Sequence, residues 1–252
     1  MTTLDTPAAI ATTTTARKAL AARSKRALVF GYTSMALPVV GIAVGGWLAL
    51  RGSKALGALV GGASLGFALV RWQLARAFTE TVAYEVEETV GDLEIRRYAA
   101  HVRAETVIEQ RNWTDALNDG FERLAGYIFR GNDTRSRIEM TAPVFATIGD
   151  DAVRPMDRVV AFVMPGDREL GDLPKPTDAR VQLRHVAGER VAVLTFDGDY
   201  RSPLPIEKGG ELVAKVRAAG LSARGEVRFG GYDAPGTLPG LRRNEVAVAI
   251  DE

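Results

Sequence analysis

The sequence predicts an α+β protein: a distorted antiparallel β-barrel made of two repeated strand-helix-strand units with two flanking helices, preceded by a two-helix transmembrane hairpin. Three observations lead to this prediction. Two long uncharged runs lie near the N-terminus, at 27–50 and 55–70. A strand-like segment then occurs twice, as Leu93–Ala99 and Val181–Ala187. Each copy is followed by another strand pattern and an amphipathic helical pattern, and such units bury their helices against an antiparallel sheet.

The chain therefore divides into three predicted parts: a basic Thr/Ala-rich tail at 1–26, a two-helix membrane hairpin at 27–76 and a folded domain at 77–252. Charge separates them as well. Residues 1–76 carry nine Lys and Arg against one acid, whereas the remainder carries 23 basic and 30 acidic residues. A basic segment suits an anionic lipid surface, and an acidic domain has no general attraction for phosphate backbones. We therefore expect a lipid bilayer, and no nucleic acid, among the partners.

The hairpin is predicted from length and hydropathy. The first run has 24 residues, enough at about 1.5 Å each to cross a hydrocarbon core of roughly 30 Å. The second has 16 and is short, although Arg71 can snorkel and Trp72 can lie at the interface. The short connection Arg51–Lys54 makes the helices antiparallel neighbours, and small residues would let their backbones approach closely: Gly41, Gly45, Gly57 and Gly61.

The basic residues on either side of the first run predict its orientation. Five of them precede the run and two lie in the turn, which favours a cytoplasmic position for both the N-terminus and the C-terminal domain. We thus expect a multi-pass membrane protein with two helices. A cleaved signal peptide is the competing interpretation, but the first run is long for a signal core and a second run follows at once.

The first repeat begins with the alternating strand Leu93–Tyr98, after which the alternation continues in the other phase from Val102. A change of phase predicts a β-bulge near Ala99 and Ala100. Asn112 is the expected N-cap of an amphipathic helix that ends before Gly131.

The segment Arg137–Val144 follows that helix. Its alternation predicts a strand with one buried face, and Pro143 restricts that strand to an edge or rim of the sheet. Further along, the pattern predicts a buried strand, a second helix and two closing strands, at Val159–Met164, Glu207–Ala219, Gly225–Gly231 and Glu245–Ile250.

Composition excludes several kinds of chemistry. The chain has no cysteine, which removes disulfides, thiol nucleophiles, thiolate metal sites and covalent c-type heme attachment. It has two histidines, His101 and His185, so a multi-histidine metal centre is hard to assemble. It also lacks a Walker loop and a dinucleotide fingerprint. We therefore do not expect an enzyme.

Several motifs together carry a family resemblance from about Tyr84 to Ile250. Arg-Ile-Glu-Met-Thr-Ala-Pro-Val at 137–144 is the most distinctive, and it is followed in order by Phe162–Pro165, Leu173–Pro176, Val191–Gly198 and Leu241–Val246. In these motifs the chain resembles the SOUL family of heme-binding proteins. The resemblance implies a distorted antiparallel barrel of duplicated units with two helices, and non-covalent binding of heme or a related tetrapyrrole. It covers none of the first 76 residues.

Candidate ligand contacts follow from the resemblance and from what a porphyrin needs, which is an apolar slot, cations near the propionates and often an axial ligand. One edge of the first helix could supply an apolar wall, although a stripe at helical spacing is more often packed core; its residues are Trp113, Leu117, Phe121 and Leu124.

For the axial ligand, one branch of the family has a histidine after the Ile-Arg of the first strand, where this chain has Arg97. Arg97 could face a propionate instead. His101 lies just past the predicted bulge and is the expected metal ligand, and His185 in the second repeat is a less favoured ligand. The pair Arg242 and Arg243 could bind propionates, or could belong to a salt-bridged turn that holds the last strand, which we favour.

The expected function is membrane-anchored, non-catalytic binding of heme or a related tetrapyrrole for buffering, delivery or sensing. Two alternatives stay open at this point. One is an effector-binding module for other amphipathic small molecules, because the duplicated units resemble bacterial effector-binding domains of the gyrase-inhibitor type. The other is an enzyme that acts on tetrapyrroles.

Overall fold

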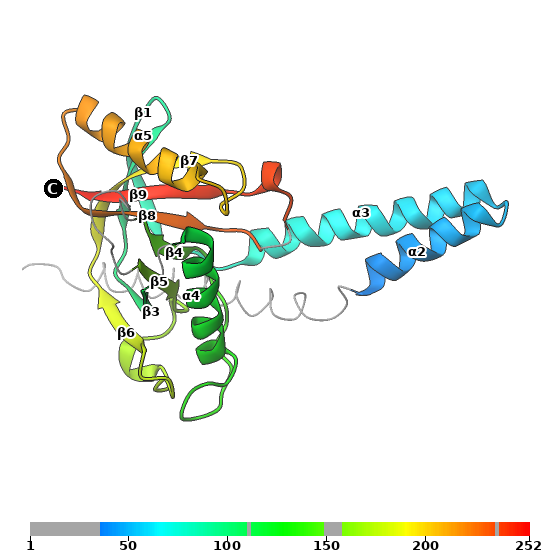
Figure 1. The fold of residues 1–252 in the computed structure, drawn as a ribbon, viewed down its shortest axis with the longest axis horizontal. Coiled ribbons are helices and arrows are strands. Elements are labelled where there is room, and N and C mark those ends of the chain that lie inside the picture. The colour runs from blue at the N-terminus through cyan, green and yellow to red at the C-terminus, as the bar shows by residue number, and fades with distance from the viewer. Residues whose placement is uncertain (1–35, 110–111, 149–157, 235–236) are drawn as a thin grey trace, which may run out of the picture. The chain divides into compact units, whose positions relative to one another are not determined.

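A computed structural model describes residues 36–109, 112–148, 158–234 and 237–252 of the chain. The predicted tail at 1–26 and the beginning of the first uncharged run lie outside these residues. The chain divides into two compact units, Met1–Thr79 and Glu80–Glu252. In the described residues it contains four α-helices and a nine-stranded sheet (Figure 1).

The first unit is a helical hairpin of α2 (Ala36–Leu50) and α3 (Lys54–Phe78). The predicted close approach of the two backbones is confirmed at Gly45, Gly57 and Gly61. A Cβ atom added to Gly45 would lie 2.7 Å from the backbone nitrogen of Gly61, and one added to Gly57 would lie 2.6 Å from the carbonyl oxygen of Gly45. The two backbones are therefore in contact, and a larger residue at either position would push them apart.

The predicted membrane spans are not supported. Within the described residues, no helix combines the length and the hydropathy needed to cross a bilayer. The multi-pass topology and the cytoplasmic position inferred from it therefore have no structural support.

The second unit is an α+β fold around one antiparallel sheet. Its strands are β1 (Tyr84–Val90), β2 (Leu93–Tyr98), β3 (His101–Ile108), β4 (Val144–Thr147), β5 (Arg158–Val163), β6 (Val181–Val186), β7 (Glu189–Phe196), β8 (Ala223–Gly231) and β9 (Asn244–Ile250). The strand order is β1-β2-β7-β9-β8-β4-β5-β3-β6. The predicted distorted barrel is not supported, because the sheet is open: β1 and β6 are its two edges and do not pair with each other.

The pairing follows the predicted repeat, but with an exchange of strands. β2 pairs with β7 and β6 pairs with β3, so the first strand of each repeat joins the half of the sheet that belongs to the other repeat. The β2–β7 pair and the β6–β3 pair have the same register. Leu93 lies opposite Leu194 in one half, and the equivalent Val181 lies opposite Thr106 in the other.

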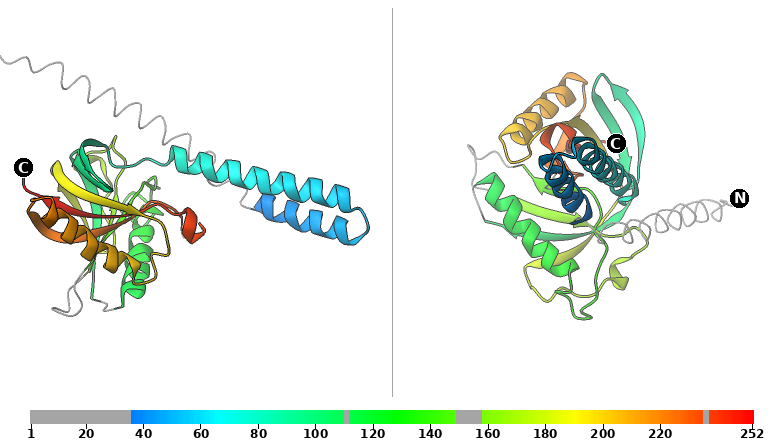
Figure 2. Two further views of the ribbon diagram at one scale, coloured as in Figure 1. Left: turned by 90° about the horizontal axis from the view of Figure 1, so that it is seen from above. Right: turned by 90° about the vertical axis from the view of Figure 1, so that its right-hand side faces the viewer.

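Helices α4 (Trp113–Ile128) and α5 (Leu204–Ala218) cover one face of the sheet. Helix α4 packs on β3 and β5, and α5 packs on β7, β8 and β9 (Figure 2). The predicted cap of α4 is confirmed, because the Asn112 side chain accepts a hydrogen bond of 3.1 Å from the backbone N–H of Asp115. Leu124 of α4 and Leu212 of α5 are fully buried in the same apolar core.

Two local predictions need correction. There is no bulge at Ala99 and Ala100; the strand ends there, and the chain crosses from one half of the sheet to the other. The segment 137–143 is not a strand, because β4 starts at Val144 and lies between β5 and β8 rather than at an edge. In that segment Thr141 is buried and donates its hydroxyl to the carbonyl of Val163 at 2.6 Å, whereas Met140 is exposed. Because Ala142 and Pro143 are buried as well, the segment does not show the alternation of a strand with one buried face.

The face of the sheet opposite the helices has a second, smaller core. Val82, Tyr98, Phe145, Ala161, Val163, Val191, Val193 and Ala247 are buried in it. The charged residues Arg96, Arg103 and Glu245 also lie on this face, since they alternate along their strands with residues of the helix-covered core. A solvent-facing sheet surface would not bury them.

Candidate functional site

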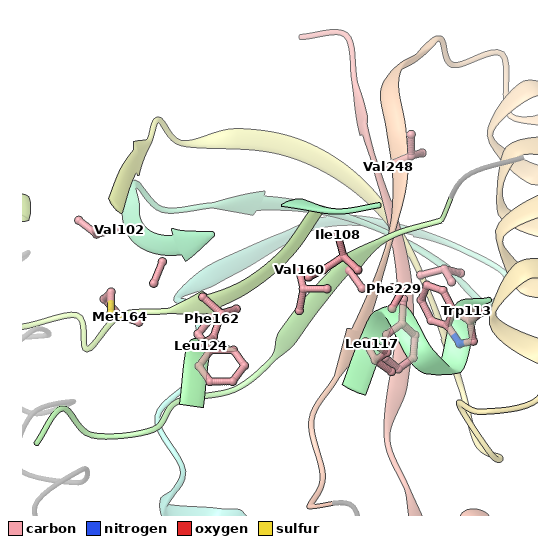
Figure 3. Close-up of a cluster of buried hydrophobic side chains, with 14 of the residues drawn as sticks. Val102, Ile108, Trp113, Leu117, Leu124, Val160, Phe162, Met164, Phe229 and Val248 are labelled. Carbon is pink, nitrogen blue, oxygen red and sulfur yellow. The ribbon is translucent and has the colours of Figure 1, made fainter. Parts of the chain in front are cut away.

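The residues of the predicted apolar wall contact the sheet. Trp113, Leu117 and Leu124 are buried and belong to the core between α4 and the strands. Figure 3 shows Trp113 and Leu117 beside Phe229. The ring of the half-buried Phe121 packs edge-on against Phe162 with the ring centroids 5.2 Å apart. A ligand could reach these side chains only if α4 moved away from the sheet, and their contact with a macrocycle stays a prediction.

The Trp113 side chain is also fixed by a polar contact. Its indole N–H donates to the carbonyl oxygen of Tyr200 at 2.6 Å, and its ring meets the ring of Phe229 edge-on at 5.7 Å. This tryptophan therefore holds the start of α4 against the loop that precedes α5.

His101 begins β3 on the face opposite the helices, and both of its ring nitrogens are hydrogen-bonded. Nδ1 lies 2.8 Å from the carbonyl oxygen of Ala99, and Nε2 accepts from Nε of Arg103 at 2.9 Å. The imidazole is therefore neutral with its proton on Nδ1, because a carbonyl only accepts. Burial, together with the charge of Arg103, lowers the pKa of His101 to about 4. A neutral imidazole is the form that binds iron, but its single lone pair is here used by Arg103.

The structure does not bring Arg97 and His185 to His101 as a common site. Arg97 is exposed and pairs with Glu87 at 2.6 Å and with Glu252 at 3.1 Å. His185 is exposed on the edge strand β6, opposite Val102. A ligand role for either residue stays a prediction.

A buried charge network holds the last strand. Both oxygens of Glu245 accept from the guanidinium of Arg96, at 2.9 and 3.2 Å, and Oε1 also accepts from Arg243 at 2.6 Å. The Tyr232 hydroxyl donates to Oε2 at 2.8 Å. Burial alone would raise the pKa of the Glu245 carboxyl, but the charges of Arg96 and Arg243 lower it below its usual value. The carboxylate is therefore ionised at neutral pH.

This network and the turn beside it explain the Leu241–Val246 motif. Arg242 donates to the carbonyl of Thr237 at 2.7 Å and pairs with Asp199 at 3.0 Å, and Asn244 donates to the carbonyl of Gly198 at 3.1 Å. The interpretation of a salt-bridged turn that holds the last strand is confirmed by these contacts.

A second group of charges lies next to His101. Nη2 of Arg228 is 2.6 Å from Oε1 of Glu189, and Nη2 of Arg103 is 3.6 Å from the same oxygen. Both guanidiniums also lie near the ring of Phe145, with Cζ at 4.6 Å for Arg103 and 5.8 Å for Arg228. We call Arg103, Arg228, Glu189 and Phe145 the arginine pair site.

The arginine pair site is short of negative charge. Arg103 is 5% exposed, and burial together with the charge of Arg228 lowers its pKa to about 10. Nη2 of Arg103 and Nε of Arg228 have no hydrogen-bond acceptor in the part of the chain that the structure describes. The guanidiniums of Arg103 and Arg228 thus share one carboxylate oxygen of Glu189, and each has an N–H group without an acceptor.

Sequence reasoning missed this site for a physical reason. In β3, Arg103 alternates with Val102 and Ala104, so the pattern assigns it to a solvent-exposed face. Only the second core, whose members are far apart along the chain, shows that this face is buried. The one available clue was an arginine placed between two apolar residues in a strand that carries a candidate ligand.

Comparisons with known proteins agree with the motif resemblance. The family model described as SOUL heme-binding protein matches residues 79–249. Heme-binding protein 2 of Mus musculus is 28% identical over 165 residues, which cover 64% of this chain and 80% of the relative. Heme-binding protein 2 of Homo sapiens is 29% identical over 159 residues, 62% of this chain and 77% of the relative.

Among solved structures, a cryo-EM structure of an EcmrR–DNA complex has a related fold. It aligns with a TM-score of 0.50 and 10% identity over 88% of this chain and 79% of that one. At this identity the likeness concerns the fold alone.

Proposed function

Because the chain belongs to the SOUL heme-binding protein family, we propose that it binds heme or a related tetrapyrrole non-covalently and does not convert it. The family match over residues 79–249 is the observation that carries this proposal. The relatives that match are named heme-binding proteins, in agreement with it. Buffering, delivery and sensing of the ligand each require binding alone.

The described residues contain groups suited to such a ligand. Their Asp, Glu and His side chains form no cluster of three or more that could hold a bare metal ion. Heme brings four nitrogen ligands of its own and needs from the protein at most one or two axial ligands. His101 is the axial ligand that we propose, because it is neutral and partly exposed. When bound, the group would supply its iron for ligation and its macrocycle for apolar contact.

A hemin titration of the full chain, followed by absorption, tests the proposal. We expect a saturable one-to-one shift of the heme band, and a reduced shift for His101→Ala. His185→Ala is the matched control, since it removes the other histidine from an exposed edge strand. Far-UV circular dichroism of each variant verifies that the fold is kept.

The possible results separate binding from ligation. The absence of any saturable shift in the wild-type chain would overturn the proposed function. A shift that survives in both variants would remove His101 from its role and leave heme binding intact.

A further inference from the structure

We propose that the arginine pair site is a carboxylate-binding site that receives a propionate of the tetrapyrrole. This inference rests on the proposed function and goes beyond it, because it assigns the polar end of the ligand to Arg103 and Arg228. Neither residue belongs to the motifs that carry the family resemblance.

The site has the charge and the donors that a second carboxylate requires. Glu189 offers one oxygen, Oε1, to both guanidiniums, at 2.6 and 3.6 Å. The longer distance exceeds that of a hydrogen bond, so Nη2 of Arg103 has no hydrogen-bond acceptor among the described residues although the side chain is almost completely buried. Leaving a buried charged donor unmet costs free energy, and a ligand carboxylate between the two guanidiniums would remove this cost.

Neighbouring charges do not supply the missing partner. Glu105 lies on the same face of β3, but its carboxylate pairs with Arg184 at 3.2 Å. Counting Arg103, Arg228 and Arg184 against Glu189 and Glu105, the group has one more positive than negative charge. His101 is neutral and adds none.

The topology explains why these residues meet. Glu189 lies opposite Tyr98, the last residue of β2. Ala99 and Ala100 then lead directly to His101, the first residue of β3. The crossing of the chain between the two halves of the sheet therefore brings the start of β7 next to the start of β3.

Two members of the arginine pair site are partly exposed. The side chains of Arg228 and Glu189 are 15% and 20% exposed, whereas Arg103 and Phe145 are almost completely buried. A carboxylate can thus reach Arg228 first, and the Phe145 ring is an apolar neighbour of both guanidiniums.

Carboxylate binding would also affect His101. Nε of Arg103 is the donor that uses the lone pair of His101 Nε2. An Arg103 drawn toward a propionate releases this nitrogen. Propionate binding and axial ligation by His101 are then coupled, and the first favours the second.

The test compares hemin with hemin dimethyl ester, in which both propionates are esterified, by absorption titration of the full chain. For the wild-type chain we expect the ester to bind roughly ten- to a hundredfold more weakly, the range for a hydrogen bond to a charged group. Arg228→Gln should weaken hemin by a similar factor and leave the ester unchanged. Arg224→Gln is the matched control, because Arg224 lies on the same strand and pairs with Asp251 at the surface.

Each result has one meaning. Equal affinity of the wild-type chain for hemin and its ester would overturn the carboxylate site while the proposed function stands. An equal loss of hemin affinity in the Arg224 and Arg228 variants would overturn it as well. Failure of both ligands to bind would overturn the proposed function and this inference together. If Arg228→Gln does not fold, the comparison of the two ligands with the wild-type chain still decides the question.

Discussion

Gly120→Ala tests whether α4 packs against the sheet as described, which is the arrangement that buries the predicted apolar wall. Gly120 faces β5, and a Cβ atom added to it would lie 2.6 Å from Cβ and 3.0 Å from Cγ1 of Val160. Val160 is 1% exposed, and its branched side chain has little rotamer freedom. The neighbour therefore cannot move aside without a shift of the backbone.

The expected magnitude is the balance of two effects. Alanine is favoured over glycine inside a helix by about 1 kcal/mol. Overpacking a tight core costs about 1–3 kcal/mol, and separations this short belong at the upper end. We thus expect Gly120→Ala to lower the free energy of unfolding by about 2 kcal/mol, measured by urea denaturation of the full chain.

A control lies six residues along the same helix. A Cβ atom at Gly126 would have nothing within 4 Å, so Gly126→Ala should stabilise by about 0.5–1 kcal/mol. Val160→Ala should restore part of the loss in a double variant, with a coupling of about 1–2 kcal/mol. If Gly120→Ala is as stable as Gly126→Ala, or if the coupling is zero, α4 does not pack on β5 in this way.

Three further predictions concern the cap of α4 and the charged groups. Asn112→Ala should cost about 1 kcal/mol in urea unfolding, because it removes the acceptor for the N–H of Asp115. Glu245→Gln should cost about 3 kcal/mol, since it leaves Arg96 and Arg243 without a buried countercharge, whereas the exposed Glu226→Gln should change stability by less than about 0.5 kcal/mol. Finally, the pKa of His101 falls from 6.5 to about 4 on folding. The unfolded chain therefore binds the extra proton between these values, and the free energy of unfolding should decrease as pH falls from 6.5 to 4, by up to about 1.4 kcal/mol per pH unit, with a smaller slope in His101→Gln. A wild-type slope equal to that of His101→Gln would contradict the buried neutral imidazole.

Local sequence rules predicted the elements of the domain well. The Asn112 cap, the helical period from Leu117 to Ile128 and the closing strands β8 and β9 all follow from short-range chemistry, and the structure has them. The repeat was also visible, because its two copies have the same pattern of apolar residues.

Long-range pairing could not be predicted in the same way. The break at Ala99 and Ala100 changes the phase of alternation as a bulge would, and only the partners of β2 and β3 distinguish the two cases. Closure of the sheet depends on whether β1 meets β6, which no local pattern encodes.

The candidate site was predictable only in part. His101 was identified as one of two histidines, just past the predicted bulge. Its partner Arg103 was not identified, because strand alternation reports which residues share a face and not whether that face is covered. The helix residues Leu117 and Leu124 show the converse limit, since an apolar stripe suits a ligand wall and a core equally well.

The exchange of strands between the repeats affects when the domain can fold during its synthesis. During synthesis, β3, α4, β4 and β5 emerge before β6, so the first half of the sheet lacks its edge strand until the second repeat has begun. β2 in turn lacks its partner β7 over the same interval. Neither half is a complete folding unit, and we expect native pairing to begin late, after most of the domain has left the ribosome. A break in the chain between β5 and β6 should thus give two pieces that fold only when they are present together.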